Sequence, residues 1–344
     1  MKTMIDTYQS FPGEHCGSVA MRGLLNHYCD LQLPEAAVFG LGSGVDSVLI
    51  ANPSMNPAVV LFGRTATMEI DLGSALGIDY REVTERDDNV AWQMVRDEVI
   101  AGRPTMLSGD IFYLDYREFT VHFPGHRFVL VGFDDESHNA FIADRVRPEA
   151  ETCSYAALAT SRNPTEGMST HNLWGRFHST KPERSLSEAS RFAIDRTVRR
   201  MLSDSSADLG SLAGADTRVV TGVAGTRAFA NEVRTWGERE DRAWLASYNA
   251  RCIEKFGNGG GNFRRMYAGF LEWTRTMDPS LVPDGAAQLA VQAADGWTAV
   301  ADILARAAED GASIGLFEEA ARGTSEVADL EQRLFETLGS VSAP

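Results

Sequence analysis

The spacing of apolar residues changes near residue 150, and this change constrains the fold more than any other feature. Before it, short apolar runs suited to strands alternate with segments of helical periodicity. After about residue 185, apolar residues recur at helical spacing almost to the end. A chain of 344 residues also exceeds what one core usually holds. We therefore predict an α+β domain at 1–150, a connecting segment at 151–185 and a mainly α-helical domain at 186–344.

Charge and cysteine content narrow the classes of function. The net charge of −16 argues against nucleic acid as a partner, because phosphate binding needs clustered Lys and Arg. An acidic field suits a cationic small molecule, although it can equally serve solubility alone. Four cysteines with no C-x-x-C pair predict neither a disulfide framework nor a zinc site. We expect a cytoplasmic protein with no membrane span, no metal and no cofactor of its own.

Cys16 is the candidate nucleophile. It lies in the run Gly-Glu-His-Cys-Gly-Ser at the start of a predicted helix over 16–30. The positive end of a helix dipole favours thiolate over thiol, and Gly17 lets an acyl group approach the sulfur. The alternative is a small buried cysteine. The other cysteines lack such surroundings and are expected to be structural: Cys29, Cys153 and Cys252.

His126 is the candidate base for this thiol. It directly precedes a strongly apolar predicted strand at 127–133, so its ring can face the helix that begins at Cys16. His122, four residues earlier, is the competing base. The alternative for either histidine is an ordinary surface position.

Asp144 is the candidate group that orients the base. A hairpin with its turn near 135–139 brings the end of the strand at 140–143 back beside the start of the preceding strand. Asp144 then lies near His126, where a carboxylate fixes the tautomer of the ring. Asp110 is the weaker alternative. The order Cys, His, Asp along the chain is that of papain-like enzymes.

An oxyanion at this site needs donors. The backbone N–H of Cys16 is one, and the Gln9 side chain is a second candidate, although it lies one residue farther upstream than the papain pattern places it. The glycine-rich segment 39–44 lacks the helix and acidic residue of a dinucleotide fingerprint. We interpret it, and Gly42 within it, as a backbone loop beside the acyl site.

Two features of the second half have two readings each. Glu254 and Arg264 flank a glycine run at 257–261 and could contact a substrate or lock a helix–turn–helix in place. One predicted helix also presents three arginines on one face. They could receive an acidic carrier protein or form a solvated face: Arg196, Arg199 and Arg200.

Several motifs together resemble the BtrH-type acyltransferases of butirosin biosynthesis. The resemblance begins at His-Cys-Gly-Ser and the Phe-Gly-Leu-Gly-Ser-Gly segment, and continues through 63–64, 110–116 and the His-Phe-Pro-Gly-His run at 122–126. The second half, most clearly at 253–267, resembles the uncharacterised helical domain that commonly follows. Asp115 departs from the family, where a proline is expected.

The resemblance implies a papain-like cysteine-peptidase fold used for synthesis. The family's named member moves an acyl group from an acyl-carrier-protein thioester to an amine of an aminoglycoside. Mapped here, Cys16 would carry the acyl group, His126 would relay protons and Asp144 would orient it. Segment 110–116, with Asp110 and Tyr113, would belong to the acceptor pocket. Hydrolysis by the same residues, and a non-catalytic binding role, remain alternatives, and the apolar helices could support a homodimer.

Overall fold

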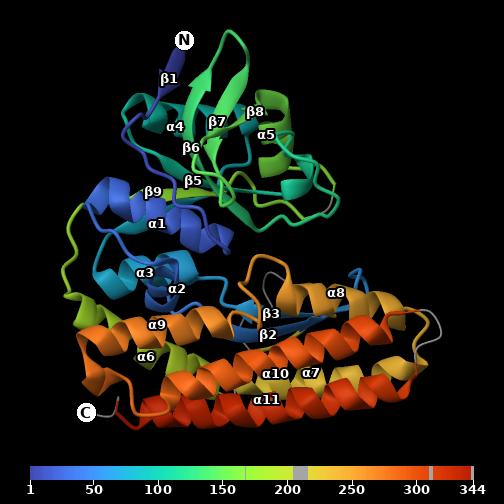
Figure 1. Cartoon of the computed structure of the whole chain (residues 1–344). Helices are drawn as coiled ribbons and strands as arrows, with labels where there is room; N and C mark the ends of the chain where they lie inside the picture. Colours follow the sequence, from blue (N-terminus) through green and yellow to red (C-terminus); the bar gives the residue numbers. More distant parts are fainter. Residues whose placement is uncertain (167, 204–215, 310–312, 342–344) are drawn as a thin grey trace. The chain divides into compact units, whose positions relative to one another are not determined.

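The computed structural model describes residues 1–166, 168–203, 216–309 and 313–341, which form two compact units (Figure 1). The first unit is Met1–Val38 with Leu76–Glu183, and the second is Phe39–Ala75 with Arg184–Pro344. These boundaries differ from the predicted ones. Residues 39–75 group with the helical half, and most of the predicted connecting segment belongs to the first unit.

The first unit is built on a seven-stranded sheet in which every paired strand is antiparallel. The order is β4-β9-β5-β6-β7-β8, and β1 also pairs with β6. The hairpin predicted between the two central strands is present, with Val129 opposite Ala143 and Asp134 opposite Asn139. The strands are β1 (Lys2–Met4), β4 (Tyr80–Val83), β5 (Thr105–Gly109), β6 (His126–Asp134), β7 (Asn139–Ala143), β8 (Glu151–Ser154) and β9 (Trp174–Phe177).

Helix α1 (Cys16–Cys29) packs against β6 and β5 of this sheet. Its start is capped by the His15 side chain, and it ends at Asp30, which takes a left-handed conformation with φ of 49°. The helices α4 (Asp88–Ile100) and α5 (Tyr155–Arg162) cover a buried cluster that includes Phe128, Phe133 and Trp174. Apolar burial of this kind is the main stabilising contribution to the unit.

The segment predicted to be an irregular connection adds to this unit instead. It contributes β8, α5 and β9. The strand β9 has only four residues and lies between polar stretches, which is too short for an alternation of apolar residues to predict a strand. Its side chains Trp174 and Phe177 are nevertheless buried. Long-range pairing with β4 and β5, rather than local pattern, makes it a strand.

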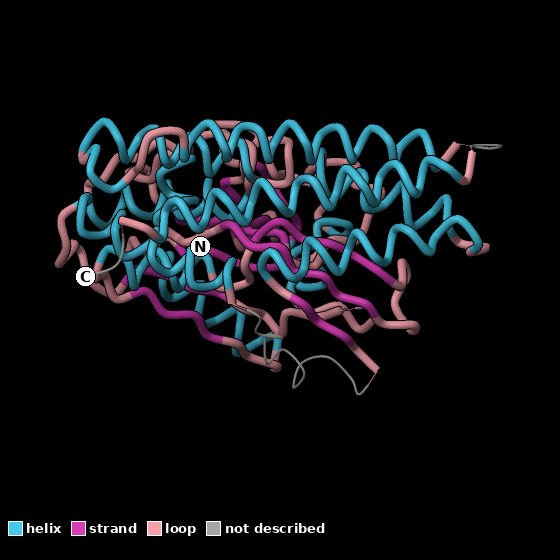
Figure 2. The backbone as a smooth tube through the Cα atoms, turned by 90° about the horizontal axis from the view of Figure 1, so that it is seen from below, coloured by secondary structure: helices cyan, strands magenta, loops and turns pink. Residues whose placement is uncertain are grey.

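The second unit joins a small sheet to long helices that run alongside one another (Figure 2). The three-stranded sheet has the order β10-β2-β3, from Arg218–Val220, Val45–Ala51 and Val59–Arg64. The predicted glycine loop at 39–44 is partly helical, because α2 (Glu35–Leu41) extends into it. The other helices are α3 (Met68–Leu76), α6 (Leu186–Leu202), α7 (Gly222–Thr235), α8 (Arg242–Glu254), α9 (Arg264–Met277), α10 (Ala286–Ala307) and α11 (Gly315–Gly339).

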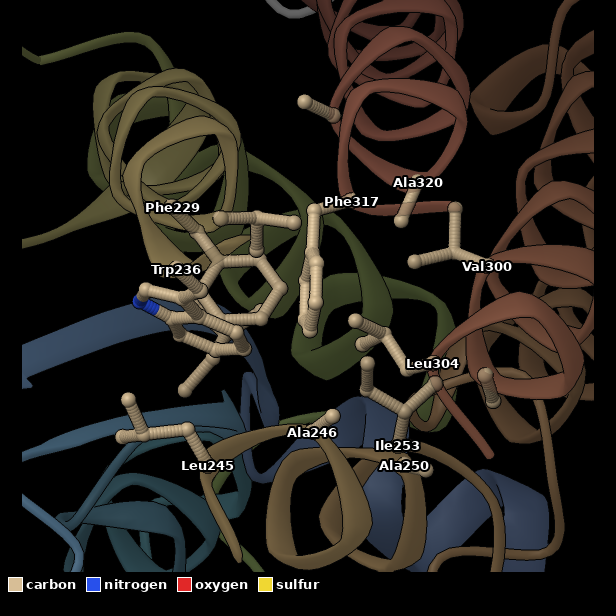
Figure 3. Close-up of a cluster of buried hydrophobic side chains, with 14 of the residues drawn as sticks. Phe229, Trp236, Leu245, Ala246, Ala250, Ile253, Val300, Leu304, Phe317 and Ala320 are labelled. Atoms are coloured by element: carbon tan, nitrogen blue, oxygen red, sulfur yellow. The ribbon is translucent and has the colours of Figure 1, made fainter. Parts of the chain in front are cut away.

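One core joins the hairpin β2–β3 to these helices. Aromatic side chains of three elements meet in it, with Phe229 edge-on to Trp236 at 5.6 Å between ring centroids and Phe317 beside Trp236 (Figure 3). The fully buried Asn249 of α8 also accepts a hydrogen bond from the Leu61 backbone N–H at 3.0 Å. The predicted mixed α/β organisation with a helical C-terminal region is confirmed. Among the described residues, no helix combines the length and apolar character needed to cross a membrane.

Candidate active site

Cys16 is the first residue of α1 and is buried, with 8% of its surface exposed. The residue before it, His15, adopts an extended conformation, and its side chain accepts a hydrogen bond from the Ser18 backbone N–H at 3.2 Å. Because of this N-terminal cap, α1 begins at the residue that carries the thiol. The partial positive charge of the helix N-terminus therefore lies at the sulfur.

The loop before Cys16 is held in place from two sides. The Glu35 carboxylate accepts the backbone N–H of Glu14 at 3.1 Å and of His15 at 2.7 Å. The Gly13 backbone N–H donates to the carbonyl of Arg145 at 2.9 Å. A Cβ at position 13 would meet a Glu35 oxygen at 2.2 Å, so a larger residue there would push this carboxylate away from the backbone N–H groups that it accepts. These bonds tie the start of α1 to the end of β7, next to Asp144.

His126 and Asp144 form a buried pair at that strand end. Nε2 of His126 lies 3.1 Å from Oδ1 of Asp144, and both side chains are almost fully buried. The ring N–H is not aimed along the line to this oxygen, so the contact is an ion pair rather than a directed hydrogen bond. The side chain of Cys16 also hydrogen-bonds with the ring of His126.

The surroundings favour the protonated form of this imidazole. Burial alone would lower the pKa of His126, but the charge of Asp144 and the close contacts of the ring with Asp144 and Cys16 outweigh it and raise the pKa to about 10. Burial likewise works to raise the pKa of Asp144, and the charge of His126 with several donors holds it below its usual range. An imidazolium beside Cys16 stabilises a thiolate.

Tyr116 and Arg117 complete the surroundings of the carboxylate. The Tyr116 hydroxyl donates to Oδ2 of Asp144 at 3.0 Å, and Nη1 of Arg117 lies 3.9 Å from the same oxygen. Burial, then the charge of Asp144, raise the pKa of Tyr116, so this hydroxyl keeps its proton and donates. The sequence places Tyr116 only within the segment 110–116 and does not single out Arg117, because the loop between β5 and β6 has no periodicity that fixes the position of a side chain.

The other cysteines differ from Cys16 in their surroundings. Burial raises the pKa of the Cys29 thiol to about 11 and, with the charge of Asp115, that of Cys153 to about 12. Burial also raises the pKa of Cys252. These thiols stay protonated and are poor nucleophiles at neutral pH.

Gln9 does not lie beside Cys16. Its Oε1 accepts a hydrogen bond from Asn26 Nδ2 at 3.4 Å. Asn26 is ten residues farther along α1, about 15 Å along the helix axis from Cys16. The segment that contains Gln9 therefore runs along α1 rather than across its N-terminus. The spacing of Gln9 and Cys16 in the sequence could not reveal this path. Gly17 is the second residue of α1, where its N–H has no acceptor within the helix.

Asp110 pairs with the competing histidine. His122 Nδ1 lies 2.7 Å from Oδ2 of Asp110, and the rings of Phe112 and Tyr113 flank His122 at 4.0 and 5.6 Å. Each candidate histidine therefore has its own carboxylate. The structure gives His126, and not His122, the buried position beside Cys16 and Asp144.

The predicted substrate residues of the second unit have structural contacts. Gly42 follows α2, and a Cβ there would meet Met68 at 2.6 Å. The Glu254 carboxylate accepts the Gly261 backbone N–H at 2.9 Å and the Thr298 hydroxyl at 3.0 Å, which fixes the glycine run. Arg264 is fully buried, and each of its nitrogens has an acceptor within the unit. Of the two readings of Glu254 and Arg264, these contacts favour the structural lock.

Two of the three arginines predicted for docking are already paired. Arg196 Nη2 and Arg200 Nη2 both lie 2.7 Å from the buried carboxylate of Asp71. Arg200 also donates to the Ser43 carbonyl at 2.6 Å. Arg199 is exposed. The helix face is therefore less positive than its sequence indicates, and docking of a carrier protein there stays a prediction.

The family comparisons match both halves of the chain. Residues 15–145 match the model described as Butirosin biosynthesis protein H, N-terminal. Residues 156–338 match the model described as Domain of unknown function (DUF4872). A search of curated proteins found no significant match to the chain. The first matched range contains Cys16, His126 and Asp144.

Proposed function

Because this chain belongs to the family that joins the N-terminal domain of butirosin biosynthesis protein H to DUF4872, we propose that it is a biosynthetic acyltransferase. It would move an acyl group from a phosphopantetheine thioester, on a carrier protein or coenzyme A, to an amine. The product would be an amide of the kind found in aminoglycoside-like antibiotics. The observation that carries the proposal is the buried His126, held between Asp144 and Cys16.

The reaction would have two halves. In the first, the Cys16 thiolate attacks the thioester carbonyl carbon, the bond to the donor sulfur breaks, and His126 gives its proton to the departing thiol. In the second, a neutral amine attacks the acyl carbon on Cys16, the carbon–sulfur bond breaks and the thiolate re-forms, and the proton that the amine nitrogen loses goes to His126. Asp144 keeps the imidazole oriented in both halves. Backbone N–H groups at the start of α1 are the donors available to the oxyanion.

We also propose a papain-like scaffold for the first unit. A helix that begins at the cysteine, packed on an antiparallel sheet that carries the histidine at a strand start, supports this assignment. The acidic net charge of −16 supports a cationic acceptor, because it concentrates cations near the surface.

Intact-mass spectrometry after brief incubation with a panel of acyl thioesters tests the proposal. The panel includes carrier-protein, coenzyme A and N-acetylcysteamine forms. We expect a mass gain equal to one acyl group in the wild type and none in Cys16→Ala. Cys29→Ala is the matched control, because it removes a thiol of raised pKa from the same helix and should still gain the acyl mass.

The fate of the adduct separates the alternatives. Discharge faster with amines than with water supports acyl transfer. Discharge by water alone would mean a hydrolase with the same residues. No adduct with any donor, or an equal adduct in Cys16→Ala, would overturn covalent catalysis at Cys16.

A further inference from the structure

Asp110 and His122 form a second carboxylate–histidine pair that is held by several hydrogen bonds, as the pair of Asp144 and His126 is. The two halves of the proposed reaction do not use this second pair. Asp110 is 4% exposed, and its Oδ1 accepts the backbone N–H groups of Phe112 at 3.1 Å and Phe123 at 2.9 Å. Its backbone is fixed by two bonds to Ser161, with the Ser161 hydroxyl donating to the Asp110 carbonyl at 2.8 Å. The carboxylate therefore has a single defined position.

This carboxylate decides which nitrogen of His122 can act as a base. The 2.7 Å contact between Oδ2 of Asp110 and Nδ1 of His122 holds a proton on Nδ1. The lone pair of the neutral ring then lies on Nε2. The side chain of His122 is 58% exposed, whereas that of His126 is 3% exposed. The imidazole of His122 is therefore open to a ligand that approaches from solvent, whereas that of His126 is largely enclosed by the protein.

The second pair lies at the same end of the sheet as the first. Asp110 directly follows Gly109, whose partner in the ladder between β5 and β6 is His126. The loop that leaves at Asp110 returns at His126, where the His126 N–H donates to the Phe123 carbonyl at 3.4 Å. Tyr116, in the middle of this loop, donates to Asp144. The loop from Asp110 to His126 thus brings both carboxylate–histidine pairs to the same end of the sheet.

We propose that His122, oriented by Asp110, accepts a proton from the ammonium form of the acceptor amine. This inference rests on the proposed acyl transfer. An aliphatic amine is almost fully protonated near pH 7, and the ammonium form has no lone pair to attack with. An imidazole backed by a carboxylate, exposed to the acceptor, meets that need. A cationic amine is therefore the acceptor class.

The step balances as follows. The ammonium gives one proton to Nε2 of His122, and the neutral amine nitrogen bonds to the acyl carbon on Cys16. The carbon–sulfur bond breaks and its electron pair stays on the Cys16 sulfur. The second proton of the nitrogen goes to His126. The products are the amide, a Cys16 thiolate beside a His126 imidazolium, and a His122 imidazolium that returns its proton to water.

The test compares two nucleophiles on the same acyl-enzyme. Wild type and His122→Asn are loaded with the donor that gave the adduct above, and equal amounts of acyl-enzyme are mixed near pH 7 with ethanolamine, which is protonated. A second aliquot receives hydroxylamine, which is uncharged at that pH. Asn keeps an N–H toward Asp110 but cannot accept a proton. His138→Asn is the control, because His138 lies in the exposed turn between β6 and β7.

We expect His122→Asn to discharge to ethanolamine about 100-fold more slowly than wild type, and to hydroxylamine within about threefold of it. Equal loss with both amines would show a structural role and overturn the inference. Unchanged discharge to ethanolamine would overturn it too. Both results would leave the acyl-enzyme, and with it the proposed function, intact. Absence of an adduct in the wild type would instead overturn the proposed function and this inference together.

Discussion

A buried pair of opposite charges lies in each unit, and the two pairs differ in how completely they are bonded. In the second unit, Arg264 Nε lies 2.7 Å from Oε1 of Glu331, and both side chains are fully buried. The other guanidinium nitrogens bond to the carbonyls of Asp46 and Asn262 and to the Ser47 hydroxyl. In the first unit, Nε2 of His126 lies beside Asp144, and the ring also contacts the side chain of Cys16.

The difference in bonding distinguishes a pair that stabilises the fold, Arg264 with Glu331, from a pair that can take part in a reaction, His126 with Asp144. We call them the structural pair and the chemical pair. Glu331 also accepts from Trp297 Nε1 and the Thr226 hydroxyl, each at 2.8 Å, so both members of its pair are saturated by fixed protein groups. A saturated pair has nothing left to offer a substrate, but removal of one member leaves a buried charge. The His126 pair has a partner that can react, because a thiolate is a nucleophile. Both pairs are buried, so burial does not distinguish them. What indicates function is contact with a reactive group, here the Cys16 thiol.

The largest effect should come from the chemical pair. His126→Asn should slow acylation of Cys16 about 1000-fold, because the ring can no longer hold and return a proton. The measurement is the rate of mass gain with an acyl thioester. His27→Asn is the control, since that ring lies on α1 and contacts only the exposed Gly102 carbonyl at 3.2 Å among its described hydrogen bonds. Acylation at wild-type rate in His126→Asn would remove the assigned role.

The structural pair should show its effect in stability. Arg264→Met should lower the free energy of unfolding by about 3–5 kcal/mol, because Glu331 is left as a buried unpaired charge. Urea denaturation followed by tryptophan fluorescence measures it. Arg265→Met is the matched control, since its ion pair with Asp295 is exposed and should contribute less than about 1 kcal/mol. Equal losses in both variants would contradict the comparison.

A smaller effect should follow at the carboxylate that orients His126. Tyr116→Phe removes the hydroxyl that donates to Asp144, and we expect acylation to slow about tenfold, in line with roughly 1.4 kcal/mol for a bond to a charged group. Tyr155→Phe removes a similar bond, to Asp135 at 3.1 Å, and should leave acylation unchanged. An unchanged rate in Tyr116→Phe would mean that the packing around Asp144 suffices to orient it.

The smallest expected effect is on how the free energy of unfolding depends on pH. The pKa of His126 is about 10 in the folded protein, above its ordinary value near 6.5, so the folded state binds this proton more tightly. The stabilisation is fully present below about pH 6.5 and is lost as the pH rises through 10. Denaturation from pH 6 to 10 should show this fall, and a smaller fall in Cys16→Ala, which lacks the thiolate. Equal slopes in both proteins would contradict a contribution from Cys16.

Local pattern predicted the parts of the site that local geometry determines. The hairpin β6–β7 has a short turn and two apolar strands, so the proximity of Asp144 to His126 follows from the alternation and the turn alone. The helix start at Cys16 follows from the glycine-flanked run and the periodicity after it. The expected helices of the second half are present for the same reason.

Long-range contacts determine the rest and leave no periodic signal. Gln9 was expected at the oxyanion, yet its contact with Asn26 depends on how the first 13 residues cross α1. Residues 39–75 were expected in the first domain, yet bonds such as that from Leu61 to Asn249 join them to helices nearly 190 positions away. Such pairings appear only when the chain has folded.

The passage of the chain through both units has a consequence for the order of synthesis. The strands β2 and β3 leave the ribosome early, but the helices that bury Leu49 and Leu61 begin only after Arg184. Until then, this apolar hairpin has no partner within its own unit and is exposed to aggregation. A fragment that ends near residue 150 would carry the same uncovered hairpin permanently. A functional first unit therefore requires the uncut chain, in which the later helices cover this hairpin.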